Sequence, residues 1–228
     1  MTFSLPGTGK DTIYRLYAVA YYSEYEYDYW RYYTIKIDDK LAAAAPAEAE
    51  KPSAPAAPTK FTDVADTSPF ATAINWAVEQ GITTGLTNTT FGPGEKCTNG
   101  QILTLLWRAS GSPEPTIDNP FTDSISASFQ KAAVWAYEKG LVSGTVFGAS
   151  TPCTRAMTVE YLWKAAGSPA TAENASFSDV PANAGYAQAV AWAVENGVTS
   201  GTGNGQFSPD NTCTRGQIVT FLYRATGK

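Results

Sequence analysis

The sequence has no histidine, and only three of its 228 residues are cysteines. A chain without histidine lacks a versatile general base and the commonest metal ligand of proteins. The cysteines recur at one equivalent position in three similar segments, whereas a disulfide framework uses an even number at distinct positions. These scarcities argue against a metal site, a cofactor or a disulfide scaffold, and we interpret the cysteines as small apolar residues.

Positive charge and long apolar runs are also scarce. Lysine and arginine total 16 against 21 aspartates and glutamates, which gives a formal net charge of -5. Nucleic-acid-binding domains normally show a basic face, so we expect no nucleic-acid partner. No apolar run reaches the roughly 18 residues of a membrane-spanning helix. The N-terminal residues lack the pattern of a secretory signal, so we expect neither membrane insertion nor a signal peptide in this chain.

What the sequence does have is internal repetition. Each repeat runs from Phe-Thr-Asp or Phe-Ser-Asp, through a tryptophan and a glycine, to a Cys-Thr step. It then closes with an aromatic-basic-Ala tripeptide followed by glycine in the same order. The repeats cover residues 61–113, 121–169 and 177–228. Three copies of a short unit favour repeated binding surfaces over one catalytic centre.

The residues before the repeats have a different composition. Residues 1–40 contain two segments rich in aromatic and β-branched residues, 12–22 and 29–37, which predict two strands. Because a lone hairpin is marginal in water, we expect them to end a truncated β-sandwich domain of a longer exported protein. Their clustered tyrosines either cover the sheet or form a platform for sugars. Residues 41–60 are rich in proline and alanine and predict a linker.

Within each repeat the apolar residues recur at helical spacing twice, which predicts helix, loop, helix. Two short helices cannot bury their apolar faces alone. We therefore expect a mainly α fold in which three helix pairs pack about an approximate threefold axis, giving a monomer that resembles a trimer.

The Cys-Thr step predicts how the second helix of each repeat begins. Thr98, Thr154 and Thr214 stand at the expected N-cap positions, and Gln101 and Gln217 complete a capping box in two repeats. The cysteine before each threonine lies where a hydrophobic staple packs onto the helix.

The residue after each threonine is the main candidate for a binding role. Arg155 and Arg215 occupy the first helical position, where a cation opposes the helix dipole. Beside unpaired backbone N–H groups, an outward-facing arginine makes a receptor for carboxylate or phosphate. The alternative is a surface arginine paired with Asp179 or Asp210.

One tryptophan in each repeat is a second candidate. These residues lie one position off the apolar stripe of the first helix, at the border between core and groove. Packing and contact with a sugar ligand are both compatible with that place. The residues are Trp76, Trp135 and Trp192.

Taken in order, these motifs resemble the S-layer homology domain, in three tandem copies over residues 61–228. The Gly203–Pro209 loop followed by Thr214-Arg215-Gly216-Gln217 carries the resemblance most clearly. It implies a pseudo-threefold bundle that binds pyruvylated secondary cell-wall polysaccharide linked to peptidoglycan. It also implies that Arg155 and Arg215 contact this ligand between repeats, whereas Asn99 replaces the arginine in the first repeat and predicts a weakened groove there.

We therefore expect a non-catalytic module that anchors a bacterial surface protein, located outside the cell at the wall. One alternative is a module through which copies of a surface layer assemble. Another is the tail of a glycan hydrolase, or a hydrolase using a carboxylate pair. Glu79, Glu138 and Glu195 recur, but they lie near helix ends, where a solvated glutamate is commonplace.

Overall fold

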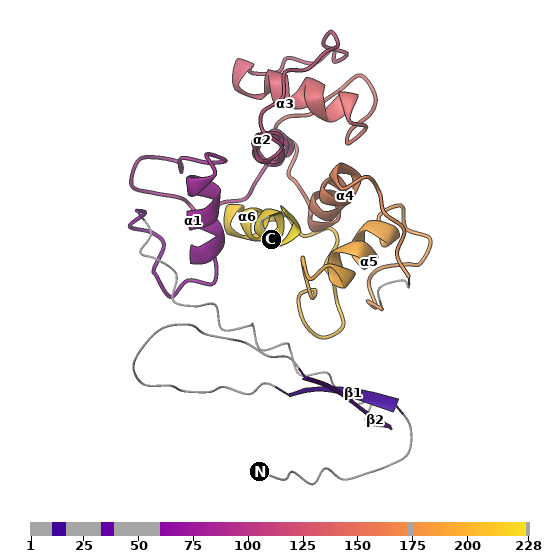
Figure 1. The fold of residues 1–228 in the computed structure, drawn as a ribbon. Coiled ribbons are helices and arrows are strands. Elements are labelled where there is room, and N and C mark those ends of the chain that lie inside the picture. The colour runs from indigo at the N-terminus through magenta and orange to yellow at the C-terminus, as the bar shows by residue number, and fades with distance from the viewer. Residues whose placement is uncertain (1–10, 17–32, 39–59, 173–175, 227–228) are drawn as a thin grey trace. The chain divides into compact units, whose positions relative to one another are not determined.

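The computed structural model describes residues 11–16, 33–38, 60–172 and 176–226 (Figure 1). The chain divides into two compact units, Met1–Glu48 and Ala49–Lys228. In the first unit, β1 (Asp11–Leu16) pairs antiparallel with β2 (Tyr33–Asp38). The aromatic residues between the strands and residues 39–59 lie outside the described residues. The truncated β-sandwich, the sugar platform and the linker therefore stay predictions.

The second unit is helical, as predicted for a mainly α chain. Each repeat contributes two helices, and glycines in the left-handed conformation follow the first helix of each repeat, for example Gly81 at φ 69°. In the described part of the chain no helix is long and apolar enough to cross a membrane. The helices are α1 (Ala71–Glu79), α2 (Asn99–Ala109), α3 (Ala127–Glu138), α4 (Arg155–Ala165), α5 (Ala187–Glu195) and α6 (Arg215–Thr226).

The helices pair between repeats. The first helix of each repeat packs against the second helix of the repeat before it, as α3 does on α2 and α5 does on α4. The pattern returns to its start, because α1 packs on α6. The second helices α2, α4 and α6 also contact one another, and they lie inside α1, α3 and α5 (Figure 1). Each apolar helix face is therefore buried by a neighbouring repeat.

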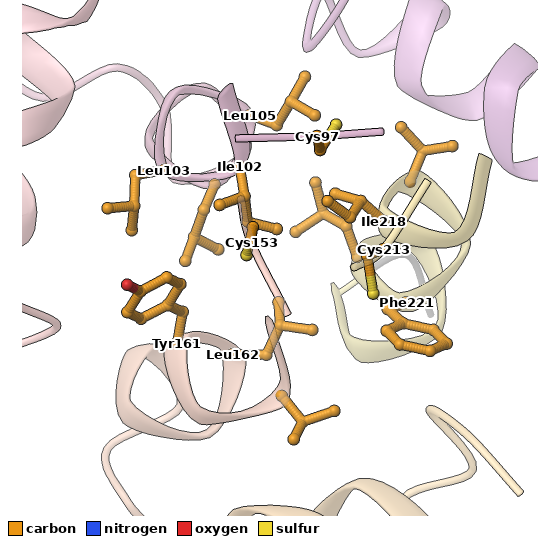
Figure 2. Packing of buried hydrophobic residues seen from close by; sticks show 14 of the residues in the cluster. Cys97, Ile102, Leu103, Leu105, Cys153, Tyr161, Leu162, Cys213, Ile218 and Phe221 are labelled. Atoms are coloured by element: carbon orange, nitrogen blue, oxygen red, sulfur yellow. The ribbon is translucent and has the colours of Figure 1, made fainter. Parts of the chain in front are cut away.

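The three cysteines join the repeats at the centre. The Cys97 N–H donates to the Cys213 carbonyl at 2.9 Å, Cys153 donates to Cys97 at 3.0 Å, and Cys213 donates to Cys153 at 2.9 Å. Their side chains are at most 1% exposed and lie in the apolar core with Ile102 and Ile218 (Figure 2). The interpretation as buried apolar residues is confirmed. The described residues contain no cluster of histidine, cysteine or carboxylate side chains that could hold a metal ion.

The predicted capping boxes are also confirmed. The Gln101 side chain accepts a hydrogen bond from the Thr98 N–H at 3.0 Å, and Gln217 does the same for Thr214. In the repeat without glutamine, the Thr154 hydroxyl accepts from the Met157 N–H at 3.3 Å. Each central helix therefore begins at the residue after its threonine.

Candidate functional site

The two arginines that follow the capping threonines are buried, so the predicted outward orientation is wrong. Arg155 is 4% exposed and Arg215 is 7% exposed. The Nε of Arg155 donates to the Phe207 carbonyl at 2.8 Å, and its guanidinium lies 4.9 Å from the Phe207 ring centroid. Arg215 makes the same contacts with Phe91, at 2.9 Å and 4.7 Å. Each arginine holds the loop of the next repeat in cyclic order.

The backbone N–H groups beside these arginines are not free either. The Arg155 N–H donates to the Asn211 carbonyl, and the Ala156 N–H donates to Pro209. Equivalent bonds join the start of α6 to the loop of the first repeat. The predicted receptor, an arginine with unpaired N–H groups, is therefore wrong, because a carbonyl-rich loop already occupies it.

The alternative interpretation of a surface ion pair does not fit either. In the described part of the chain, neither arginine forms an ion pair. Burial lowers the pKa of both guanidinium groups, and the negative charge of Asp179 partly opposes this for Arg155. Carbonyl groups and aromatic rings therefore compensate the buried charge.

In the first repeat, Asn99 holds the loop of the next repeat as the two arginines do. It is 4% exposed, and its side-chain amide donates to the Phe147 carbonyl at 2.8 Å. The Tyr161 hydroxyl donates to its Oδ1 at 2.7 Å. Tyr161 stands where Phe221 stands in the third repeat, and Phe221 lies 5.2 Å from Arg155. A hydrogen-bonded Asn–Tyr pair thus replaces an Arg–Phe pair.

The aspartate of each Phe-Thr-Asp or Phe-Ser-Asp motif holds the loop of its own repeat. The two carboxylate oxygens of Asp123 accept from the N–H groups of Phe147 and Gly148, at 2.8 and 2.9 Å. Asp63 and Asp179 do the same in the other repeats. Sequence reasoning used this motif only to mark the repeats, although its recurrence with the loop phenylalanine was a visible signal.

The three tryptophans are not equivalent in exposure. Trp135 is 4% exposed and Trp192 is 7% exposed, so both are mainly core residues. Trp76 is only partly buried, and its ring packs 5.4 Å from that of Tyr223. Of the three, Trp76 presents the most surface for a ligand.

Two hollows lie at equivalent places in the first and second repeats. The α1 groove, of about 270 Å³, and the α3 groove, of about 490 Å³, each lie beside the repeated tryptophan and the end of the following helix. The α1 groove is lined by Trp76, Gln80, Ile82, Arg108, Ala109, Gly111 and Thr226. The α3 groove is lined by Ser110, Pro113, Trp135, Lys139, Lys164, Ala165 and Gly167. Each groove takes residues from two repeats.

A basic residue recurs near the end of each central helix. Arg108, Lys164 and Arg224 donate to carbonyl groups just beyond the first helix of their own repeat, at 3.1, 3.4 and 3.3 Å. Such a cation is favoured at the negative end of a helix dipole. Arg108 and Lys164 line the two grooves, so they place positive charge beside a tryptophan in an acidic chain. Sequence reasoning missed these cations, although the repeated aromatic-basic-Ala tripeptide marked them.

The same segments can be compared with known proteins. The S-layer homology domain family matches residues 60–102 and 176–219. The chain therefore contains S-layer homology domains. The first matched segment includes Trp76 and Asn99, and the second includes Trp192 and Arg215. The residues of the middle repeat, among them Arg155 and Trp135, lie between them.

Two relatives are larger proteins. Over 179 residues the chain is 32% identical to an endoglucanase of Bacillus sp. (strain KSM-635), covering 72% of this chain and 19% of that protein. Over 117 residues it is 30% identical to a cell surface protein of Thermoanaerobacter kivui, covering 47% of this chain and 15% of that protein. The chain thus spans less than a fifth of the length of either relative.

Proposed function

We propose that the helical unit is a non-catalytic module that anchors a bacterial surface protein at the cell wall. Its ligand is an anionic, pyruvylated secondary polysaccharide linked to peptidoglycan. The S-layer homology domains and the relative named as a cell surface protein support this location. The observation that carries the ligand class is the repeated combination of tryptophan and cation in the grooves.

We also infer that the middle repeat, residues 121–169, is a third S-layer homology repeat, and that the three are related by an approximate threefold axis. Three features support this. The cysteine hydrogen bonds close a ring through all three repeats, the aspartate-to-loop bonds recur in each, and the helices pair in cyclic order. A single chain then offers several related grooves to a repetitive polymer.

The chemistry of the grooves suits such a polymer. A sugar ring presents an apolar face, which can lie against an indole ring. A ketal carboxylate adds a negative charge, which a lysine or arginine at the groove can bind by charge-assisted hydrogen bonds. In this proposal Arg155, Arg215 and Asn99 hold the loops between repeats. Trp76 and Trp135 with the nearby cations form the walls of the two grooves, and Trp192 lines neither of them.

A sedimentation assay with purified cell-wall sacculi tests the proposal. We expect the chain to bind intact sacculi and to lose binding after the polysaccharide has been chemically removed. Triple replacement of Arg108, Lys164 and Arg224 by glutamine should abolish binding while the thermal unfolding transition remains. A Lys131→Gln variant, which alters an exposed cation of α3, is the matched control. Equal binding to intact and stripped sacculi would refute the proposal.

The similarity to an endoglucanase favours a second candidate function, in which the protein held at the wall is an enzyme. The chain would then attach a glycan-degrading enzyme to the wall and contribute no catalytic residue itself. Sequencing the complete gene decides between an enzyme and a structural surface protein as the cargo. A concentration-dependent oligomer without any glycan binding would instead support an assembly module.

A further inference from the structure

The α1 groove has more uncommitted hydrogen-bond donors than the α3 groove. Arg108 is exposed, and within the described residues its guanidinium makes one hydrogen bond, from Nη1 to the Ile82 carbonyl. The edge formed by Nε and Nη2 is left open. Such an edge matches the two oxygens of a carboxylate. The Gln80 amide lines the same groove, and in the described part of the chain it has no side-chain partner.

One of the two cations of the α3 groove, Lys164, is already engaged. The Lys164 ammonium lies 2.8 Å from the Glu160 carboxylate and also donates to the Leu141 carbonyl at 3.4 Å. The positions equivalent to Glu160 in the first and third repeats are threonines, Thr104 and Thr220. Lys139 adds a second ammonium, but an ammonium is a point charge without the planar fork of arginine.

The aromatic residues of the two grooves also favour ligand binding in the α1 groove. Trp76 is partly exposed, and its indole N–H makes no hydrogen bond among the described residues. Tyr223 supports the ring from α6. Trp135, in contrast, is 4% exposed, so it offers little surface to a sugar. Among the described residues, a partly exposed indole next to a guanidinium with an open edge occurs in the α1 groove and not in the α3 groove.

We propose that the α1 groove is the principal site of this chain for an acidic sugar residue. The Arg108 edge binds the carboxylate in bidentate fashion, Trp76 lies against the sugar ring, and Gln80 bonds a hydroxyl group. This inference rests on the proposed function, since it selects one groove for the same ligand class. The presence of Asn99 in place of arginine predicted a weakened groove in the first repeat. This proposal ranks the grooves instead by the cations near the C-terminal ends of the central helices.

Single-groove variants test the choice of site. The assay measures the affinity of each variant for intact sacculi and, separately, for the polysaccharide released from them. Arg108→Gln and Trp76→Leu should each weaken binding at least about tenfold, the scale of losing a hydrogen bond to a charged group. Arg108→Lys keeps the charge and loses the fork, so we expect it to recover only part of the affinity. The matched control, Lys131→Gln, alters an exposed cation that lines neither groove and should change affinity less than about threefold. Lys164→Gln should weaken binding less than Arg108→Gln does.

Each outcome bears on one of the two proposals. Strong loss with Lys164→Gln and little loss with Arg108→Gln would overturn the choice of the α1 groove and leave the anchoring function intact. Wild-type affinity in all of these variants, with binding still dependent on the polysaccharide, would overturn it as well. Equal binding of the wild type to stripped sacculi would instead overturn the anchoring function. Thermal unfolding of every variant separates loss of binding from loss of fold.

Discussion

At the scale of single residues, a charged side chain at the start of a helix can bind either a ligand or a neighbouring segment of the chain. Arg155 serves a neighbour, because its Nε bonds the Phe207 carbonyl and one further nitrogen lies 3.3 Å from the Thr199 hydroxyl. Removing it would leave a buried carbonyl unpaired and a cavity between two phenylalanine rings. Unpaired buried polar groups and cavities are two main causes of large stability losses.

We therefore expect Arg155→Ala and Arg215→Ala each to lower the free energy of unfolding by about 2–4 kcal/mol. Chemical denaturation measures the effect, and Lys131→Ala serves as the exposed control. Wild-type stability combined with lost binding to sacculi would contradict the structural role and support direct ligand contact.

The loop-holding aspartates give a pH dependence at the same scale. Hydrogen bonds from the Phe147 and Gly148 N–H groups hold the pKa of Asp123 below its ordinary value. Since the folded state favours the ionised carboxylate, its stabilising contribution is present above the ordinary pKa of about 3.9. It is lost as the pH falls through the lower value of the folded state.

Asp123→Asn should therefore destabilise the protein at pH 7 and have a smaller effect near pH 3, because the wild type has by then lost part of the contribution that depends on its lowered pKa. Urea unfolding at both pH values measures this, with Asp118→Asn as the control at an exposed position. An equal loss of stability at both pH values would contradict the role of the ionised carboxylate.

At the scale of helices, two of the three contacts between repeats show a clear difference in chemistry. The start of α4 meets the third repeat through Arg155 and Phe221, and the start of α2 meets the second repeat through Asn99 and Tyr161. In both, one polar side chain bonds the loop carbonyl of the next repeat. Asparagine is shorter than arginine, and the tyrosine hydroxyl donates to its side-chain oxygen.

The asparagine and tyrosine should consequently behave as one unit. Tyr161→Phe leaves a buried amide oxygen unpaired and should cost about 1–2 kcal/mol. Asn99→Arg crowds the tyrosine and should cost about 1–3 kcal/mol. The double variant recreates the Arg–Phe pair, so its loss should be smaller than the sum, as a double-mutant cycle measures. Strict additivity would contradict the coupling.

Helix positions were accessible to sequence reasoning, whereas helix partners were not. The apolar period and the Thr-x-x-Gln boxes predicted α2 and α6, and each begins next to its threonine. The pattern did not say which helices cover each other. In the structure α1 packs on α6 and α3 on α2, because periodicity identifies an apolar face but not the surface that covers it.

At the scale of the whole molecule, the cysteine ring ties the first, second and third repeats together. Burial raises the pKa of Cys97 to about 11 and that of Cys153 to about 12, and it raises the pKa of Cys213 as well. Thiols react as thiolates, so these three are protected while the ring is closed. No repeat can expose its cysteine without breaking hydrogen bonds to both others.

The helical unit should accordingly unfold in one cooperative step that exposes all three thiols together. Maleimide labelling across a denaturant series, read by mass spectrometry, should give the same midpoint for each cysteine and for the loss of helical signal. Single Cys→Ala variants assign the labelled sites. Labelling of one cysteine well before the others would mean that the repeats open independently.

The sequence by itself determined the repeats, the helical class, the capping of the central helices and the apolar nature of the cysteines. These properties follow from the local spacing and chemistry of the side chains, and they recur in every repeat. Tertiary structure alone decided where Arg155 and Arg215 point, because the loop that covers them belongs to the next repeat. It also decided that Arg108 has an open edge and Lys164 does not, since that depends on which neighbour reaches each charge in space.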